Sequence, residues 1–374
     1  MKAPVSGLIP APLAQLPWRV LFLVIAIGVS GWVVLFSAAG GSLTPWALRQ
    51  ATLFCAFLGL AIVLSRVTPR TLSRIALPGY VIVLVLLILV ETLGAVRGGS
   101  QRWLDLGFIR LQPSEFMKPM IILAMAKFYD GLPQVEVRRF GPLVPAGILV
   151  GVPFLLVYLQ PDLGTGLMIL GGGVTVMFLA GTPLRIFIGA AMALGIAGPL
   201  AYNLLLHEYQ RNRIAIFLNP EADPLGTGYH ISQSKIAIGS GGLTGKGFLQ
   251  GSQIHLDYLP EGHTDFAFAT MVEEWGLIGG LAVIVAFMLL IRWGINVGLR
   301  ANTRFERLTA GGLATAIFFY FAINLMMVMG LAPVVGIPLP FISYGSSAQM
   351  TVMICIGMLM SIDRQTRHAP GGGW

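Results

Sequence analysis

The chain has 374 residues, of which 56% are hydrophobic and only 11% are charged. Soluble domains carry about 25% charged residues. The mean hydropathy of +0.80 also excludes an ordinary soluble globular protein. The net charge is +8, so the positions of the cations decide between nucleic-acid binding and the basic loops of a membrane protein.

Ten apolar stretches follow one another along the chain, and a membrane-spanning helix needs about 20 such residues. We predict spans at residues 18–38, 46–65, 75–95, 113–128, 142–159, 163–181, 183–205, 265–291, 307–330 and 345–362. The first stretch is longer than the apolar part of a signal peptide, which indicates an uncleaved first helix. The sequence therefore predicts an all-α, multi-pass integral membrane protein, with residues 1–374 forming a single membrane domain.

The lysines and arginines indicate which side of the membrane each loop occupies. With the N-terminus inside, 15 of them fall in cytoplasmic segments and seven fall in outer segments. Cytoplasmic loops are enriched in these residues, so we predict that both termini lie in the cytoplasm. The basic cytoplasmic loops of a membrane protein then explain the positive net charge, and we expect no nucleic-acid partner.

One connection, at residues 206–264, is much longer than the others. Connections between elements are usually about 2–8 residues long, and longer ones are often functional. This one has no spanning run, mixes Ile231 and Ile236 with polar residues, and contains a glycine-rich stretch from Gly239 to Gly251. The predicted orientation makes it a large extracytoplasmic loop, and we predict that it lies on or dips into the outer membrane surface.

The sequence excludes several common kinds of site. Cys55 and Cys355 each lie inside an apolar run, so neither a disulfide framework nor a thiolate metal cluster is available. The segment Gly241–Gly247 lacks the spacing of a phosphate-binding loop, because Lys246 is followed by glycine. Four of the five histidines lie in or near the long connection, but no pair has the spacing of a zinc site. We expect no cofactor, and the sequence leaves a divalent cation open.

Three helix starts on the predicted outer side carry residues that suit an anion site. Pro113 and Pro161 are each predicted as a first helical residue, Asp162 follows the second of them, and Asp265 opens the eighth span. Helix N-termini offer free N–H groups and the positive end of the helix dipole. Such a ring of helix ends suits a pyrophosphate group.

Ionisable residues inside the predicted spans each cost roughly 2.5–3.5 kcal/mol on insertion scales, so they need an explanation. Glu115 and Lys118 lie three residues apart on one helix, where they either form a structural ion pair or both face a cavity. Glu273 and Glu274 are explained either by packing and hydrogen bonding or by a cavity with a role in proton transfer.

Asp265 also has two interpretations. An acidic residue at a helix N-terminus is favoured by capping and by the helix dipole alone. The functional alternative is a general base at the outer edge of the membrane, close to the basic connection. Position in the sequence leaves both open.

Five stretches of the chain together form a motif pattern that few protein families share. They lie at residues 102–118, 160–165, 219–242, 259–266 and 338–345. They include Gln112-Pro113-Ser114-Glu115 and Pro260-Glu261-Gly262-His263-Thr264-Asp265. In these stretches the chain resembles the SEDS family, named for shape, elongation, division and sporulation, and its rod-shape members more than its division members.

The resemblance implies a peptidoglycan glycosyltransferase that polymerises lipid II on the outer face of the bacterial cytoplasmic membrane during cell elongation. It implies that Asp265 is the general base and that undecaprenyl pyrophosphate is the leaving group. The implied partners are a class B penicillin-binding protein and other membrane proteins of the elongation complex. The implied substrate-binding residues, several of them cations that would neutralise the pyrophosphate, are Arg102, Trp103, Arg110, Glu115, Lys118, Asp162, Arg211, Arg213, Lys235 and Ser343.

Two other functions stay open at this point. A lipid II flippase would also need intramembrane charge and a hydrophilic cavity, and a non-catalytic scaffold for the partner enzyme would need neither. An acid at the outer membrane edge beside a large outward connection favours the enzyme, because a carrier would place charge near the bilayer midplane. Glu273 and Glu274 keep the transport alternative open.

Overall fold

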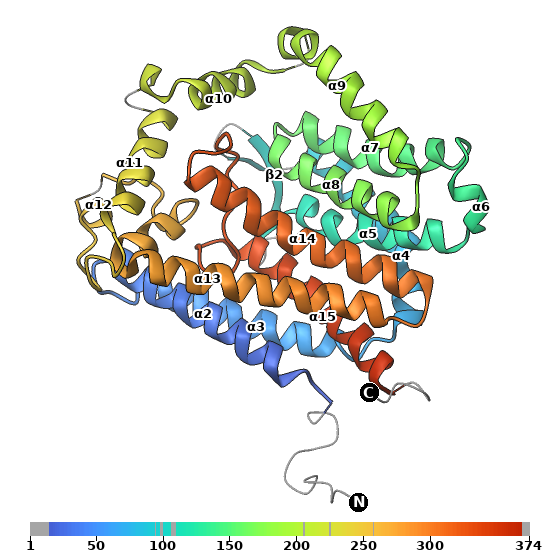
Figure 1. Ribbon diagram of the computed structural model, residues 1–374, viewed down its shortest axis with the longest axis horizontal. Helices are drawn as coiled ribbons and strands as arrows, with labels where there is room; N and C mark the ends of the chain where they lie inside the picture. The colour runs from blue at the N-terminus through green and yellow to red at the C-terminus, as the bar shows by residue number, and fades with distance from the viewer. Residues whose placement is uncertain are drawn as a thin grey trace, which may run out of the picture.

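The structure is a computed structural model that describes residues 15–93, 95–97, 100–105, 110–204, 206–223, 226–256 and 258–368. It is almost entirely helical, as predicted (Figure 1). The helices are α2 (Trp18–Ala38), α3 (Ala47–Leu64), α4 (Pro69–Leu93), α5 (Pro113–Asp130), α6 (Gln134–Val137), α7 (Leu143–Leu159), α8 (Leu163–Ala180), α9 (Leu184–Leu204), α10 (Glu208–Leu218), the 3-10 helix η1 (Pro220–Ala222), α11 (Thr227–Ser240), α12 (Ser252–His255), α13 (Ala267–Arg300), α14 (Arg304–Val328) and α15 (Ser346–His368).

A helix lies at each of the ten predicted spans. Within the described residues, seven helices are long and apolar enough to cross a membrane, namely α2, α3, α4, α8, α13, α14 and α15. The apolar helices at Leu143–Leu159 and Leu184–Leu200 are shorter, and α5 carries charged residues near both ends. The fold class is therefore confirmed, whereas the number of spans and their orientation stay predictions.

Several helices extend beyond the predicted limits at their charged ends. Helix α4 begins six residues before the predicted span, and α13 runs nine residues past its predicted end at 291. Apolar patterning marks the part of a helix that contacts lipid, whereas the backbone hydrogen bonds continue into the charged ends. The predicted limits were wrong there for that reason.

Helix α5 lies at the centre of the bundle and packs against α4, α7, α8, α14 and α15. Residues 121–126 of α5 are completely buried. A helix that is covered by protein on all sides does not have to be apolar all round, because its polar residues can pair with neighbouring helices. This position allows α5 to carry charged residues inside the membrane domain.

Three short strands between α4 and α5 form a small antiparallel arrangement that the sequence analysis did not predict. They are β1 (Ala95–Arg97), β2 (Ser100–Asp105) and β3 (Arg110–Leu111), in the order β1-β2-β3. The strand β2 contacts both α4 and α5. It carries two of the predicted site residues, Arg102 and Trp103.

The long connection 206–264 is partly helical rather than a loop throughout. Figure 1 shows α9 and α10 reaching over one end of the molecule toward α11. Helix α11 packs against α13 and α14, with Ile231 and Ala237 buried. The Ser234 hydroxyl donates to the carbonyl of Val328 at 2.7 Å. The amphipathic part of the long connection therefore forms helix α11, which packs against the bundle.

The long helix α13 is broken at Gly276, whose φ of +67° and ψ of −168° are not helical. The glycine-rich segment 241–247 fills this break. Two amides of the segment donate to carbonyls of α13 at 2.9 and 3.1 Å, and two amides of α13 donate back to the segment at 2.9 and 3.2 Å. The segment therefore supplies the backbone hydrogen bonds that the break removes from the helix.

The predicted topology is tested with single cysteines at two exposed positions. In a chain whose exposed Cys55 is replaced by serine, Thr244→Cys lies in the long connection and Asn302→Cys lies between α13 and α14. We expect an impermeant thiol reagent to label only Thr244→Cys on spheroplasts, and both variants after the membrane is opened. Labelling of only Asn302→Cys on intact spheroplasts would show that the orientation is reversed.

The docking of the glycine-rich segment is tested by two matched substitutions. A Cβ at Gly245 would lie 2.0 Å from the carbonyl oxygen of Glu274, whereas a Cβ at Gly242 would meet nothing within 4 Å. Both glycines have positive φ, so each alanine adds about 1–2 kcal/mol of backbone strain. Only Gly245→Ala also pushes the segment away from α13. We expect Gly245→Ala to lower the melting temperature in detergent more than Gly242→Ala and to expose residues 243–251 to protease. Equal losses would mean that the close approach is unimportant.

Candidate active site

A polar cavity of about 210 Å³ opens between β2 and the ends of α5, α8, α14 and α15. It brings together five of the residues singled out in the sequence, Arg102, Trp103, Glu115, Lys118 and Asp162. The residues that complete its lining are Gln112, Thr165, Tyr320, Gly336, Ile337, Pro338, Ser347 and Ala348. The cavity wall therefore carries two cations and two carboxylates.

Glu115 and Lys118 form the predicted ion pair, with Lys118 Nζ 2.6 Å from Glu115 Oε1. Two further side chains complete a buried network around this pair. Lys118 Nζ also donates to the Tyr320 hydroxyl at 2.8 Å, and the Tyr320 hydroxyl in turn donates to Glu115. Thr351 donates to Glu115 Oε2 at 2.9 Å. The pair therefore both faces the cavity and is satisfied by protein groups.

Arg102 is held loosely by comparison. Its Nη1 lies 3.7 Å from Asp162 Oδ2, its Nε donates to the Gln160 carbonyl at 3.2 Å, and its Nη2 donates to the Pro161 carbonyl. The side chain of Arg102 is 30% exposed, whereas that of Lys118 is 3% exposed. Arg102 is therefore the more accessible cation of the two.

The start of α8 differs from the prediction. Pro161 is not the first helical residue but lies in the turn before the helix. Asp162 is the N-cap, and its carboxylate accepts a hydrogen bond from Thr165 N at 3.2 Å. Pro113, in contrast, occupies the first turn of α5 as predicted.

Asp265 lies two residues before α13, and the start of α13 has no side-chain cap. The capping interpretation of Asp265 therefore does not describe this structure. A Cβ at Gly336, which lines the cavity, would lie 3.5 Å from Asp265 Oδ2. Burial raises the pKa of Asp265 to about 6, the Glu261 carboxylate adds to the rise, and the Arg213 guanidinium opposes it.

The segment that carries Asp265 is held from several sides. The rings of Trp46 and His263 stack with centroids 4.0 Å apart. Tyr344 N donates to the His263 carbonyl at 2.9 Å, and Thr270 Oγ1 donates to the Gly262 carbonyl at 3.0 Å. Burial lowers the pKa of His263, against an opposing effect of the nearby Glu261 carboxylate. These contacts fix the backbone on the N-terminal side of Asp265.

Two of the other predicted residues, Arg213 and Lys235, lie outside this cavity lining. Arg213 lies over the Tyr209 ring at 5.6 Å and acts on Asp265 through its charge. The side chain of Lys235 lies against Gly330, just beyond the C-terminal end of α14, where a cation is favoured by the helix dipole.

Arg211 and Ser343 are also separate from the cavity lining. Arg211 lies on α10, and its Nε is buried with no hydrogen-bond partner among the described residues. Ser343 is buried in a turn, where its hydroxyl accepts a hydrogen bond from Leu339 N at 3.0 Å. Arg110 belongs to β3, and its side chain lies outside the described residues.

Glu273 and Glu274 anchor the long connection to α13. Glu273 Oε1 lies 2.5 Å from Lys246 Nζ and accepts a hydrogen bond from the Ser252 hydroxyl at 3.1 Å. Glu274 accepts a hydrogen bond from Ser37 and lies 3.7 Å from His255 Nε2. Neither glutamate lines the polar cavity. The structure thus favours the hydrogen-bonding interpretation of this pair.

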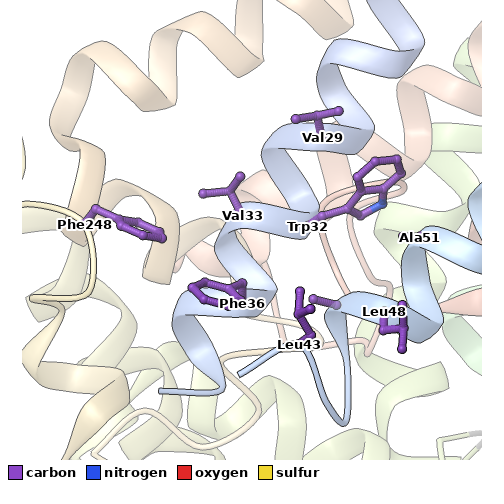
Figure 2. A pocket seen from close by; sticks show the side chains of 9 residues that line it. Val29, Trp32, Val33, Phe36, Leu43, Leu48, Ala51 and Phe248 are labelled. Carbon is purple, nitrogen blue, oxygen red and sulfur yellow. The ribbon is translucent and has the colours of Figure 1, made fainter. Parts of the chain in front are cut away.

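A second pocket is apolar and lies apart from the polar cavity. It has a volume of about 260 Å³ and is formed by α2, α3 and the long connection. Figure 2 shows Phe248 of the connection facing Phe36 of α2 across it, and the two rings stack with centroids 6.2 Å apart. This contact packs the long connection against the outer surface of α2.

Metal binding finds no support in the described part of the chain. No three His, Cys, Asp or Glu side chains come close enough there to hold a metal ion.

Comparisons with known proteins agree with the motifs. The family model for cell cycle proteins of the FtsW, RodA and SpoVE type matches residues 14–368. The peptidoglycan glycosyltransferase MrdB of Escherichia coli K12 is 43% identical over 345 residues, which cover 91% of this chain and 92% of MrdB. Stage V sporulation protein E of Bacillus subtilis 168 is 39% identical over 286 residues, covering 76% of this chain and 77% of that protein.

Solved structures give the same result. One concerns the structural coordination of polymerization and crosslinking by a peptidoglycan synthase complex, and its matching chain has a TM-score of 0.82 at 31% identity, covering 94% of this chain and 99% of that chain. The rod shape determining protein RodA of Thermus thermophilus has a TM-score of 0.70 at 29% identity, covering 94% and 97%. The chain therefore belongs to the FtsW, RodA and SpoVE family, which is the family that its motifs indicate.

Proposed function

We propose that this chain polymerises lipid II into glycan strands at the outer face of the bacterial cytoplasmic membrane, with Asp265 as the general base. The class of activity follows from the family, and the chain is a peptidoglycan glycosyltransferase. The observation that carries the proposal is a half-buried carboxylate beside a cavity that is lined by two cations. Cell elongation is the process that its similarity to MrdB and RodA favours.

The reaction requires one proton transfer and one displacement. The 4-hydroxyl oxygen of one disaccharide bonds to the anomeric carbon of another, and the bond from that carbon to the pyrophosphate oxygen breaks. Asp265 accepts the hydroxyl proton, and undecaprenyl pyrophosphate leaves with the bonding electrons. A base works best when its pKa lies near the operating pH. An aspartate with a pKa of about 6 is mostly ionised at pH 7 and is more basic than an ordinary aspartate.

The leaving pyrophosphate needs positive charge, and the two cavity cations differ in what they can offer. Lys118 already donates to Glu115 and Tyr320 and is almost completely buried. Arg102 donates to two backbone carbonyls, but its only anionic partner among the described residues is Asp162 at 3.7 Å, and its guanidinium is partly exposed. A pyrophosphate could therefore replace Asp162 as the anionic partner of Arg102. In this proposal Arg102 contacts the leaving group, and Lys118 contributes mainly through its charge.

The partners follow from the same similarity. The matching chain in the peptidoglycan synthase complex belongs to an assembly that coordinates polymerization with crosslinking. We infer that a class B penicillin-binding protein crosslinks the strands made here, together with other membrane proteins of the elongation complex. Transport of lipid II draws less support than polymerisation, because Glu273 and Glu274 face Lys246 and His255 of the long connection and neither lines the polar cavity.

Replacing Asp265 tests the general base. A positioned base contributes about 10²–10⁴-fold to the rate, so Asp265→Asn should lower lipid II polymerisation by at least that order while the protein still folds and binds its partner. A second signature is the pH dependence of the native protein. The rate should fall as the pH drops through about 6, because protonated Asp265 cannot accept the proton.

Two variants act as controls for this prediction. Asp130→Asn replaces another aspartate, whose carboxylate accepts a hydrogen bond from Phe305 N at 3.1 Å, and it should leave polymerisation unchanged. Glu261→Gln removes a charge that raises the pKa of Asp265, so the acidic fall in rate should move to lower pH. Near-normal polymerisation by folded Asp265→Asn would place the base elsewhere.

The Glu115–Lys118 pair is tested by comparing single and double substitutions. Glu115→Gln or Lys118→Met alone leaves a buried partner unpaired, which destabilises a protein by about 3–5 kcal/mol. The double variant removes both charges, so we expect it to recover most of the stability. If the pair serves the reaction, glycan polymerisation stays at least about 100-fold reduced in the double variant.

The matched control is the ion pair between Asp363 and Arg367, whose Nη2 to Oδ2 distance is 2.6 Å. Asp363→Asn with Arg367→Met should retain normal polymerisation. Recovery of both stability and activity in the double variant of Glu115 and Lys118 would show that their pair is purely structural.

A further inference from the structure

Asn324 lies on α14, is completely buried, and connects two segments next to the polar cavity. Its side-chain amide nitrogen donates to the carbonyl of Asp265 at 3.0 Å and to the carbonyl of Ile337 at 2.8 Å. Both neighbours are acceptors, so the orientation of the amide is determined by the hydrogen-bond network. Each of the two N–H groups of the Asn324 amide therefore has a backbone carbonyl as its acceptor.

The two carbonyls belong to segments without regular secondary structure. Asp265 precedes the first residue of α13, and Ile337 lies in the extended connection between α14 and α15. No helical or strand ladder sets the spacing between these segments. The Asn324 amide is a direct link between them, and it is anchored on a rigid helix that packs against α5, α8 and α13.

The side chain of Asp265 lies next to the same connection. Gly336 precedes Ile337, has a φ of +74°, and lines the cavity together with Ile337. A Cβ added at Gly336 would lie 3.5 Å from Asp265 Oδ2, so the carboxylate faces this glycine. The Asn324 amide therefore holds two segments at the place where the Asp265 carboxylate lies beside the cavity lining.

We propose that Asn324 is a positioning residue for Asp265, which holds the carboxylate at the rim of the cavity within reach of the substrate hydroxyl. This inference rests on the proposed role of Asp265 as the general base. Asn324 itself is absent from the cavity lining, so it acts through Asp265 and not by touching the substrate. Displacing a reacting group by about 1 Å can cost a factor of about 100 in rate.

Two substitutions change the hydrogen bonds of Asn324 while keeping the number and branching of its side-chain heavy atoms. Asn324→Leu removes both donors, and Asn324→Asp replaces the NH₂ group by an oxygen. The matched control is Thr309→Val, which also removes a polar group from a completely buried position on α14. Thr309 lies 15 residues from Asn324, about 22 Å along the helix. All variants are compared as full-length protein with the partner enzyme, using lipid II as substrate.

Three measurements separate positioning from a general loss of structure. We expect both Asn324 variants to lower kcat about 100-fold with little change in KM, because the residues that line the cavity are intact. We also expect the acidic fall in rate to move below pH 6 in Asn324→Leu, because a released carboxylate becomes better solvated. The charged groups around Asp265, which are Glu261 and Arg213, and the neighbouring His263 are unchanged in Asn324→Leu and Thr309→Val. Asn324→Asp adds a carboxylate beside Asp265, so of the two Asn324 variants only Asn324→Leu is used for the pH profile. Thr309→Val should retain normal kcat, KM and pH profile.

The outcomes decide the proposal in each case. Folded Asn324 variants with normal kcat, or a folded Asn324→Leu variant with a reduced kcat and an unchanged pH profile, would overturn it. If neither Asn324 variant folds while Thr309→Val does, Asn324 is a structural residue and the proposal is wrong. Asp265→Asn, measured in parallel, identifies a different failure: if it stays active, the general base itself is misassigned.

Discussion

The pairing of Glu115 with Lys118 inside the membrane domain is the interaction on which the rest of the site depends. Lipid offers no hydrogen bonds, so charged groups in a membrane helix must find their partners within the protein. This condition explains why α5 lies at the centre, covered by five other helices, and why Tyr320 and Thr351 point hydroxyls at the pair. Glu115, Lys118 and Tyr320 of this network also line the polar cavity, so the network supplies part of its polar wall.

The same requirement governs the backbone in the N-terminal half of α13. The break at Gly276 frees amides and carbonyls, and the glycine-rich segment 241–247 supplies their partners. Lys246 and Glu273 add a side-chain ion pair to this junction. Because Asp265 lies just before the same helix, the long connection and the candidate base are attached to one short helical segment.

The sequence predicted most of the fold and part of the site. Runs of apolar residues located a helix at every predicted span, and the three-residue spacing of Glu115 and Lys118 predicted their contact. Asn324 and Thr351 were missed because one polar residue in an apolar helix has no partner at a recognisable spacing. Their partners come from segments that only the folded bundle brings together. Pro161 was misplaced because a proline before an aspartate fits a turn as well as a first helical turn.

The distribution of charge also bears on the choice between an enzyme and a carrier. A carrier needs its charged groups near the bilayer midplane, accessible from each side in turn. Here Arg102 and Asp162 lie where β2 meets the start of α8, and Asp265 lies before α13 rather than inside it. All three belong to one end of the bundle. Chemistry at a membrane surface needs this arrangement, because the sugars and the leaving pyrophosphate remain in the aqueous layer while the lipid tail stays in the bilayer.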